Sequence, residues 1–190
     1  AQAFLCDCLE NGAGYCSRLG EPQQFQALLQ CAFEMAMGSP AGGPAWVSSE
    51  HAGGCGASCP RCLREYGNLP YHGLLDWRMG FDMLRILRDG AATTVDLRTP
   101  IREGLENPWL RLVEGGGDVL AGPARAFGFT PSDEGSGRRF VKDGVILIES
   151  HPLWIESHPV LQAARSSYGP GVRSVNPYRV GRRPGDIAAQ

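Results

Sequence analysis

The chain has 190 residues, of which 43% are hydrophobic and 20% are charged, and its formal net charge is −2. This composition is typical of a folded globular protein and excludes a disordered chain, while the charge excludes a uniformly basic nucleic-acid coat. The length is that of one ordinary domain, or of a small module followed by an extension.

The sequence lacks the signals of several common classes of protein. It contains no apolar stretch as long as a membrane-spanning helix, so we expect no contact with a membrane. The only lysine, Lys142, is followed by Asp143, so the chain has no phosphate-binding loop and no ATP site of that kind. The chain begins in apolar residues without a methionine, and we expect it to be a piece of a longer protein.

Cysteine usage indicates reduced thiols rather than a disulfide framework. The seven cysteines all lie within the first 62 residues, and their spacing is uneven. A disulfide scaffold would have an even number of cysteines, distributed more widely along the chain. We therefore expect a local thiol site and a cytoplasmic protein.

In the first half of the chain, two helical patterns flank a long loop. Residues 3–9 predict a short buried strand that ends at a turn over residues 11–14. Apolar side chains recur at helical spacing from Pro22 to Met37, and a second such pattern runs from about Gly73 to Arg88. The glycine- and cysteine-rich segment between them, residues 38–72, is too long for a loop in a compact domain unless something organises it.

The second half of the chain has weaker patterns. Residues 140–148 predict a β-hairpin around the tight turn Asp143-Gly144. The last 26 residues hold five arginines against one aspartate, which agrees either with contacts to a nucleic-acid backbone or with solvated arginines in a disordered end. The other elements that we expect are a strand at Thr93–Leu97, a helix at Pro100–Val113, a loop over 114–138 and a helix at Pro159–Arg165.

The tetrapeptide Glu-Ser-His-Pro occurs twice, beginning at Glu149 and at Glu156, with its histidines at His151 and His158. A metal-dependent hydrolase or nuclease could use these four side chains. Each histidine precedes a proline, which favours an extended backbone and keeps the two rings from sharing one helix face. We therefore favour turn chemistry and keep the hydrolase as an alternative.

The strongest chemical signal is the spacing His51-x3-Cys55-x3-Cys59-x2-Cys62. A C-x2-C step lets two thiolates bind one ion from a tight turn, and zinc takes four nitrogen or sulfur ligands in a tetrahedron. The three cysteines supply three ligands, and His51 is the nearest candidate for the fourth. Four protein ligands would make a closed, structural site for one Zn²⁺, and metal binding would supply folding free energy to the long loop.

Two other interpretations of this segment stay open. His72 or Cys31 could replace His51 as the fourth ligand. Alternatively, Cys59 and Cys62 could form a redox pair, because a C-x-x-C arrangement lowers the pKa of a thiol. A redox pair would not need Cys55 nearby, which favours zinc.

The residues that follow the cysteines mix cations, aromatic rings and amides, as in surfaces that contact a single nucleic-acid strand. In the alternative interpretation, Tyr66, Tyr71 and Trp77 pack the loop onto the second helix, and Asp76 pairs with an arginine. The candidates for nucleic-acid contact are Arg61, Arg64, Tyr66, Asn68, His72 and Arg78.

The stretch from Cys55 to Arg78, with Cys-Pro-x-Cys-Leu-x-x-Tyr-x-Asn and His-x-x-Leu-Asp-Trp-Arg, resembles the zinc-binding C-terminal domain of MrfA-type DEAD/DEAH-box helicases. Related domains occur in the phage-defence system DISARM. The stretch from Asp7 to Tyr15 is also similar to that domain, so the resemblance covers about residues 3–88. The resemblance implies a four-cysteine zinc module that is appended to a helicase motor and helps to engage DNA. The fourth cysteine has no clear counterpart here, and His51 would replace it.

We therefore expect an α+β (or small α/β) fold, with a zinc module of two main helices at 1–90 and a glycine-rich extension with a hairpin at 91–190. The expected function is that of an accessory domain of an ATP-dependent helicase in DNA repair or phage defence. Its partners would be helicase motor domains, in the same or a partner chain, and single-stranded or forked DNA. ATP would bind only in the missing motor part, and no catalytic residue is expected in this chain. A protein-docking scaffold is a further alternative.

Overall fold

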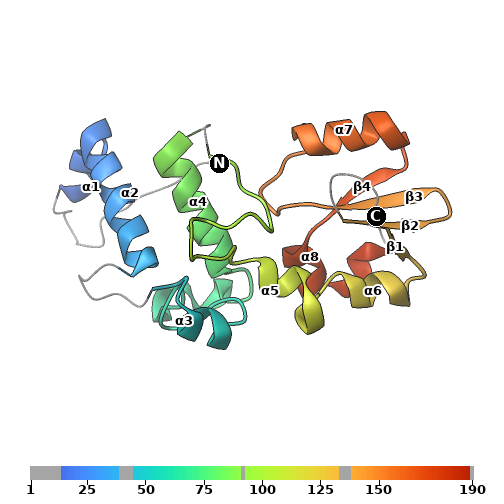
Figure 1. Ribbon diagram of the computed structural model, residues 1–190. Helices are drawn as coiled ribbons and strands as arrows, with labels where there is room; N and C mark the ends of the chain where they lie inside the picture. The colour runs from blue at the N-terminus through green and yellow to red at the C-terminus, as the bar shows by residue number, and fades with distance from the viewer. Residues whose placement is uncertain (1–13, 39–44, 91–92, 133–137, 189–190) are drawn as a thin grey trace. The chain divides into compact units, whose positions relative to one another are not determined.

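The computed structural model describes residues 14–38, 45–90, 93–132 and 138–188. It divides the chain into two compact units, Ala1–Thr94 and Val95–Gln190. Helices and a four-stranded sheet confirm the expected α+β class (Figure 1). The strand expected at 3–9 and most of the turn at 11–14 lie outside the described residues.

Two long helices form the framework of the first unit. Helix α2 (Pro22–Met37) has the bounds that its apolar periodicity predicts, with proline in its first turn and Gly38 in the left-handed conformation at its end. It packs against α4 (Trp77–Asp89), and the rings of Phe33 and Phe81 stack with centroids 5.6 Å apart. The other helical elements of this unit are α1 (Tyr15–Leu19), α3 (Ser49–Gly54) and the 3₁₀ helix η1 (Tyr66–Tyr71).

Helix α4 begins later than the apolar pattern predicts. The first helical residue is Trp77 rather than Gly73, because the side chain of Asp76 accepts a hydrogen bond from the Arg78 N–H and caps the helix there. The preceding residues belong to η1 and to the turn that follows it. Asp76 therefore separates the loop from the helix.

Two expectations for the start of the second unit were wrong. Residues 93–97 form no strand, and only Leu110–Val113 (α5) is helical within the segment expected to be one helix. Here backbone groups bond to side chains instead of to one another. Asp96 accepts from the N–H groups of Arg98 and Thr99. Asn107 donates to the carbonyl oxygens of Asp96 and Thr99. Such local bonds compete with a helix.

The second unit is built on a mixed sheet with the strand order β1-β2-β3-β4. The hairpin expected at 140–148 is present as β2 and β3, and both of its turn residues have positive φ, 46° at Asp143 and 80° at Gly144. Strand β4 pairs in parallel with β3 after the crossover helix α7. The strands are β1 (Thr130–Ser132), β2 (Arg139–Lys142), β3 (Val145–Glu149) and β4 (Val172–Val175).

Helices cover both faces of this sheet. Figure 1 shows α7 (Pro159–Tyr168) on one face, and α6 (Ala121–Ala126) and α8 (Pro177–Arg182) on the other. The segment expected as a loop at 114–138 thus contains α6 and β1 as well as the 3₁₀ helix η3 (Gly115–Gly117). The basic end of the chain contributes β4, α8 and the 3₁₀ helix η4 (Pro184–Ile187).

Apolar side chains form a buried core in each unit. Trp77 and Phe81 are buried in the first unit, while Trp109, Phe140 and Leu147 are buried in the second. Among the described residues, no helix combines the length and the apolar character that crossing a membrane requires.

Candidate metal centre

Four side chains of the first unit bring their ligand atoms together: His51, Cys55, Cys59 and Cys62. These atoms all lie within 4.8 Å of one another. The Cys59 and Cys62 sulfurs are 3.8 Å apart, those of Cys55 and Cys62 are 3.9 Å apart, and the Cys59 sulfur lies 3.5 Å from Nε2 of His51. The arrangement can hold one metal ion.

Two short pieces of backbone position these ligands. His51 and Cys55 lie four residues apart at α3, which Ser48 caps by accepting from the His51 N–H, so both side chains lie on one side of the helix. Cys59 and Cys62 lie in a tight turn, in which the Cys62 N–H donates to the Cys59 carbonyl at 3.0 Å. The Cys59 N–H also donates to the Cys62 sulfur at 3.1 Å.

The orientation of the His51 ring is fixed from its other side. Nδ1 lies 2.8 Å from the carbonyl oxygen of Trp46, and because a carbonyl oxygen only accepts, Nδ1 carries the proton. Nε2 therefore presents its lone pair to the three thiols. The ring is 2% exposed and lies edge-on to Trp77, with centroids 5.3 Å apart. A ligating histidine held by a backbone carbonyl is a common feature of metal sites.

Burial and neighbouring groups shift the pKa values of the three thiols in different directions. Burial, together with the neighbouring Cys62 and Cys59, raises the pKa of Cys55 to about 12. Burial also raises the pKa of Cys62. Burial opposes ionisation of Cys59 as well, but hydrogen bonds from the Arg61 backbone and from its neighbours leave the pKa of Cys59 lowered. Three close thiolates need a nearby cation to ionise together.

The start of α4 holds the metal loop, residues 51–64, in place. The indole Nε1 of Trp77 donates to the Cys55 carbonyl at 3.3 Å, and the Trp77 N–H donates to the Ala57 carbonyl at 2.8 Å. Arg78 donates to the Gly56 carbonyl at 2.9 Å and pairs with Asp76, and both of these charged residues are buried. Arg78 is therefore a buried residue at the start of α4 and not part of the surface where a contact with nucleic acid was expected.

The other residues expected to contact nucleic acid divide into two groups. Arg61, Arg64 and Tyr66 are exposed, and Arg61 pairs with Glu50 at 2.9 Å. Asn68 and His72 are half-buried and bond to each other, with His72 Nε2 2.8 Å from Asn68 Oδ1.

The two alternative ligands are outside the described metal cluster. The ring of His72 is engaged with Asn68, and Cys31 is exposed on α2. Neither joins the group formed by His51 and the three cysteines.

The repeated Glu-Ser-His-Pro segments have different environments. His151 is 1% exposed, accepts from the Leu153 N–H at Nδ1 and lies edge-on to Trp109. His158 stacks on Trp154 with centroids 3.9 Å apart, and burial together with the nearby His151 lowers its pKa. Glu149 is bonded to Arg98.

These second-unit side chains do not resemble a metal site. Glu156, in the second repeat, pairs with Arg165 at the surface. Within the described residues, the two histidines and two glutamates do not form a group of three converging ligands. The geometry therefore gives no support to the alternative of a metal-dependent hydrolase.

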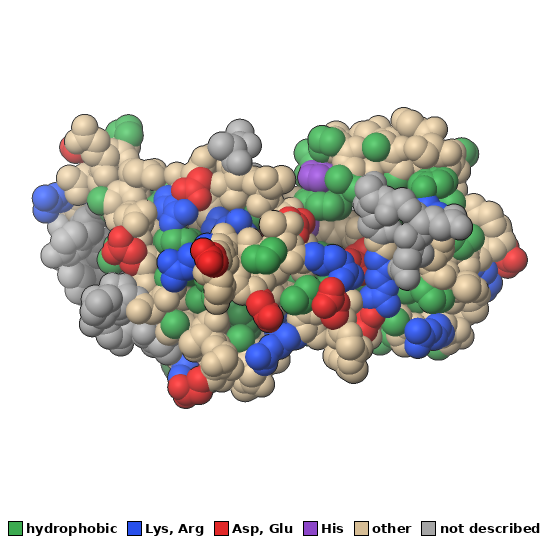
Figure 2. All heavy atoms as spheres, viewed as in Figure 1, with side chains coloured by type: hydrophobic (Ala, Val, Ile, Leu, Met, Phe, Trp, Pro, Cys, Tyr) green, Lys and Arg blue, Asp and Glu red, His purple; other side chains and the backbone are tan. Residues whose placement is uncertain are grey.

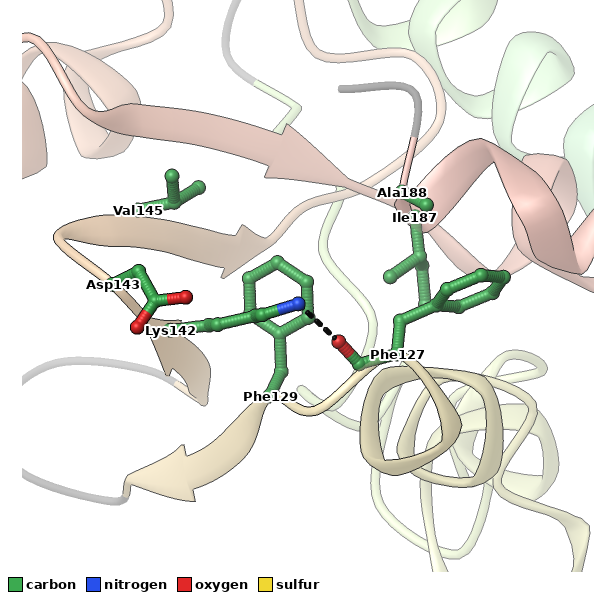
Figure 3. A pocket seen from close by; sticks show the side chains of 7 residues that line it. All are labelled: Phe127, Phe129, Lys142, Asp143, Val145, Ile187 and Ala188. Carbon is green, nitrogen blue, oxygen red and sulfur yellow. Dashed lines mark hydrogen bonds between the residues drawn. The ribbon is translucent and has the colours of Figure 1, made fainter.

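Sequence patterns gave no sign of a small cavity in the second unit, of about 210 Å³. In Figure 3, the only lysine of the chain, Lys142, extends along this cavity and donates to the Phe127 carbonyl oxygen at 2.8 Å. That bond places a positive charge at the end of α6, where it stabilises the helix. The lining residues are Phe127, Phe129, Lys142, Asp143, Val145, Ile187 and Ala188.

No family model matches the chain, and comparison with curated proteins and with solved structures gave no match either.

Proposed function

We propose that His51, Cys55, Cys59 and Cys62 bind one structural Zn²⁺. In a tetrahedral site with Zn–S bonds of about 2.3 Å and Zn–N bonds of about 2.0 Å, neighbouring sulfurs lie about 3.8 Å apart, and sulfur and nitrogen about 3.5 Å apart. Two of the distances between sulfurs here, Cys59–Cys62 and Cys55–Cys62, are 3.8 and 3.9 Å, and the Cys59 sulfur lies 3.5 Å from Nε2 of His51. All four ligand atoms lie within 4.8 Å of one another. These three distances support zinc as the metal.

The closed ligand set is the observation that carries the functional proposal. Four protein ligands fill a tetrahedron and leave no position for a catalytic water, so the metal would shape the fold rather than perform chemistry. The segment from Ala45 to Asp76 contributes few buried apolar side chains of its own, which agrees with metal binding as its source of folding free energy.

We further propose that this module is an accessory domain of an ATP-dependent DEAD/DEAH-box-type helicase, and that it contacts single-stranded or forked DNA. The support is the resemblance of the stretch from Cys55 to Arg78, together with the exposed Arg61, Arg64 and Tyr66 beside the metal site. The ATP site would belong to motor domains in the same or a partner chain. The process would be DNA repair or phage defence, and the free thiols favour a cytoplasmic location.

Elemental analysis of the purified chain, with Cys59→Ser as the test variant, checks the metal proposal. We expect about one zinc per wild-type chain, and loss of zinc from Cys59→Ser. Cys31→Ser is the matched control, because this exposed cysteine lies outside the ligand group and its loss should leave the zinc content unchanged. A wild-type chain that folds without metal would contradict the proposal.

The proposed contact with DNA has its own test. It compares binding of a labelled forked DNA to the zinc-loaded chain with binding to the same chain after chelation. We expect binding by the loaded chain and its loss on chelation. A loaded chain that binds neither forked nor single-stranded DNA would contradict the proposed contact with DNA.

A further inference from the structure

The segment that follows the metal loop exposes an unusual number of large apolar side chains. Tyr66 is 91% exposed, more than any other large hydrophobic residue in the described part of the chain, and Tyr71 is 59% exposed. Leu69 and Leu74 are 52% and 65% exposed. Large exposed apolar side chains that gather on a surface mark a site of interaction, and these four lie within nine residues of sequence.

This segment is held in one conformation. The Oδ1 atom of Asn68 accepts from the Glu65 N–H at 2.9 Å, while its Nδ2 atom donates to the Leu63 carbonyl at 2.8 Å. His72 Nε2 lies 3.1 Å from the Glu65 carbonyl oxygen and also bonds to Asn68. The exposed rings are therefore presented by a braced backbone, and a ligand would find the surface already ordered.

Hydrogen bonds also connect the segment that carries the two tyrosines to the turn at Cys59–Cys62. Leu63 follows Cys62 directly, and Ser58 precedes Cys59. Ser58 accepts from Nε of Arg64 at 2.9 Å and donates to the His72 carbonyl at 3.5 Å. Metal binding would thus fix the position of the tyrosine segment as well as that of the ligands.

The charges around the segment do not favour a contact directed at phosphates. Residues 1–94 contain nine aspartates and glutamates against six arginines, and Arg78 is buried. Arg61 pairs with Glu50, and Arg64 bonds to Ser58. On the face shown in Figure 2, acidic and basic side chains are interspersed rather than gathered into a basic patch. Any nucleic acid held here would be held mainly through its bases.

The size of the surface favours a nucleic-acid strand over a protein. Tyr66, Tyr71 and the two exposed leucines together offer on the order of 500 Å², below the roughly 800 Å² per partner of a standard protein interface. Stacking of two bases needs only two accessible rings and contributes affinity with any base, because every base has a π face.

We propose that Tyr66 and Tyr71 are a stacking platform for unpaired bases, so that the module holds a single strand by its bases with little help from phosphate contacts. The inference rests on the proposed contact of the module with DNA. It adds the residues, the preference for unpaired bases, and a weak dependence of affinity on salt.

The test measures fluorescence anisotropy of a labelled oligothymidylate with the zinc-loaded chain. We expect Tyr66→Ala and Tyr71→Ala each to weaken binding about tenfold, and Tyr66→Phe, which keeps the ring, to bind like the wild type. Ile155→Ala is the control for loss of an exposed apolar side chain elsewhere. A strand of the same length made of abasic sites keeps its phosphates, and we expect the wild type to bind it much more weakly.

The possible failures are distinguishable. Equal binding of the abasic strand, or unchanged binding by both alanine variants with full zinc content, would overturn the stacking platform and leave the proposed function standing. Absence of all DNA binding by the zinc-loaded wild type would overturn both. Self-association of the wild type that Tyr66→Ala and Tyr71→Ala abolish would assign the surface to a protein contact and overturn the inference.

Discussion

His51 and His72 are both near the three cysteines in sequence, but their rings are engaged differently. The Trp46 carbonyl holds Nδ1 of His51 and leaves Nε2 for a metal, whereas the ring of His72 is occupied by Asn68 and the Glu65 carbonyl. We expect His51→Ala to lower zinc affinity by more than the roughly 10- to 100-fold that loss of an outer-shell partner costs. His72→Ala should leave it unchanged. Competition with a chromophoric chelator measures both, and equal losses would contradict the assignment.

Zinc affinity should depend strongly on pH. Burial raises the pKa of Cys55 to about 12 and also raises that of Cys62, so without a cation these thiols keep their protons at neutral pH. Zinc must displace those protons, and each lowering of pH strengthens the competition. The same competition, measured from mildly alkaline to mildly acidic pH, should show affinity falling continuously as pH falls. A flat profile would mean that the thiols are not the ligands.

The three cysteines of the site could be predicted from the sequence, whereas the choice of the fourth ligand depends on tertiary contacts. Spacing alone identified Cys55, Cys59 and Cys62, because a C-x2-C turn and a nearby third cysteine bring sulfurs together locally. The nitrogen ligand required knowledge of α3 and of the Trp46 carbonyl. For Arg78 the structure agrees with the alternative interpretation, in which Asp76 pairs with an arginine, because Asp76 and the Gly56 carbonyl hold its side chain in the interior.

At the level of elements, the two Glu-Ser-His-Pro segments are a natural comparison. Glu149 ends β3, its side chain is 5% exposed, and Arg98 bonds to it through two nitrogens. Glu156 pairs with Arg165, but its side chain is 70% exposed. We expect Glu149→Ala to destabilise the second unit by about 1–3 kcal/mol, because Arg98 loses a buried acceptor while it keeps its pair with Glu114.

The matched change Glu156→Ala should cost about 0–1 kcal/mol, since water screens an exposed pair. Urea unfolding followed by far-UV circular dichroism measures the two variants side by side. Similar losses in both would show that the Glu149 pair does not tie residues 95–99 to the sheet.

Elements with a strong local cause were predictable, and those with a tertiary cause were not. The periodicity of α2 and the Asp143-Gly144 turn contain their own signals. By contrast, most of the helix expected over Pro100–Val113 is absent. The side chains of Asp96 and Asn107 bond to the backbone there, and their partners are fixed only in the folded unit. Strand β4 exists because β3 offers it a parallel partner, so the short segment Val172–Val175 alone could not reveal it.

At the level of the whole molecule, the metal loop and the second unit have different sources of stability. Most of the described metal loop lacks buried apolar side chains, and two members of the metal group, His51 and Cys55, are among its buried residues. The second unit instead surrounds a sheet with buried residues such as Trp109, Phe140 and Leu147. Stability that comes from a bound ligand disappears with the ligand, whereas stability that comes from an apolar core does not.

Chelation of the zinc-loaded chain should therefore open the metal loop and spare the second unit. Limited trypsin digestion reports this directly, because Arg61 and Arg64 lie in the metal loop, while Arg139 lies in β2. We expect cleavage after Arg61 and Arg64 to accelerate on chelation, because local opening exposes the backbone to the protease. Cleavage after Arg139 should stay slow, since its strand is paired on both sides. Simultaneous loss of protection at all three sites would show that the chain unfolds as one cooperative unit, with zinc supporting both halves.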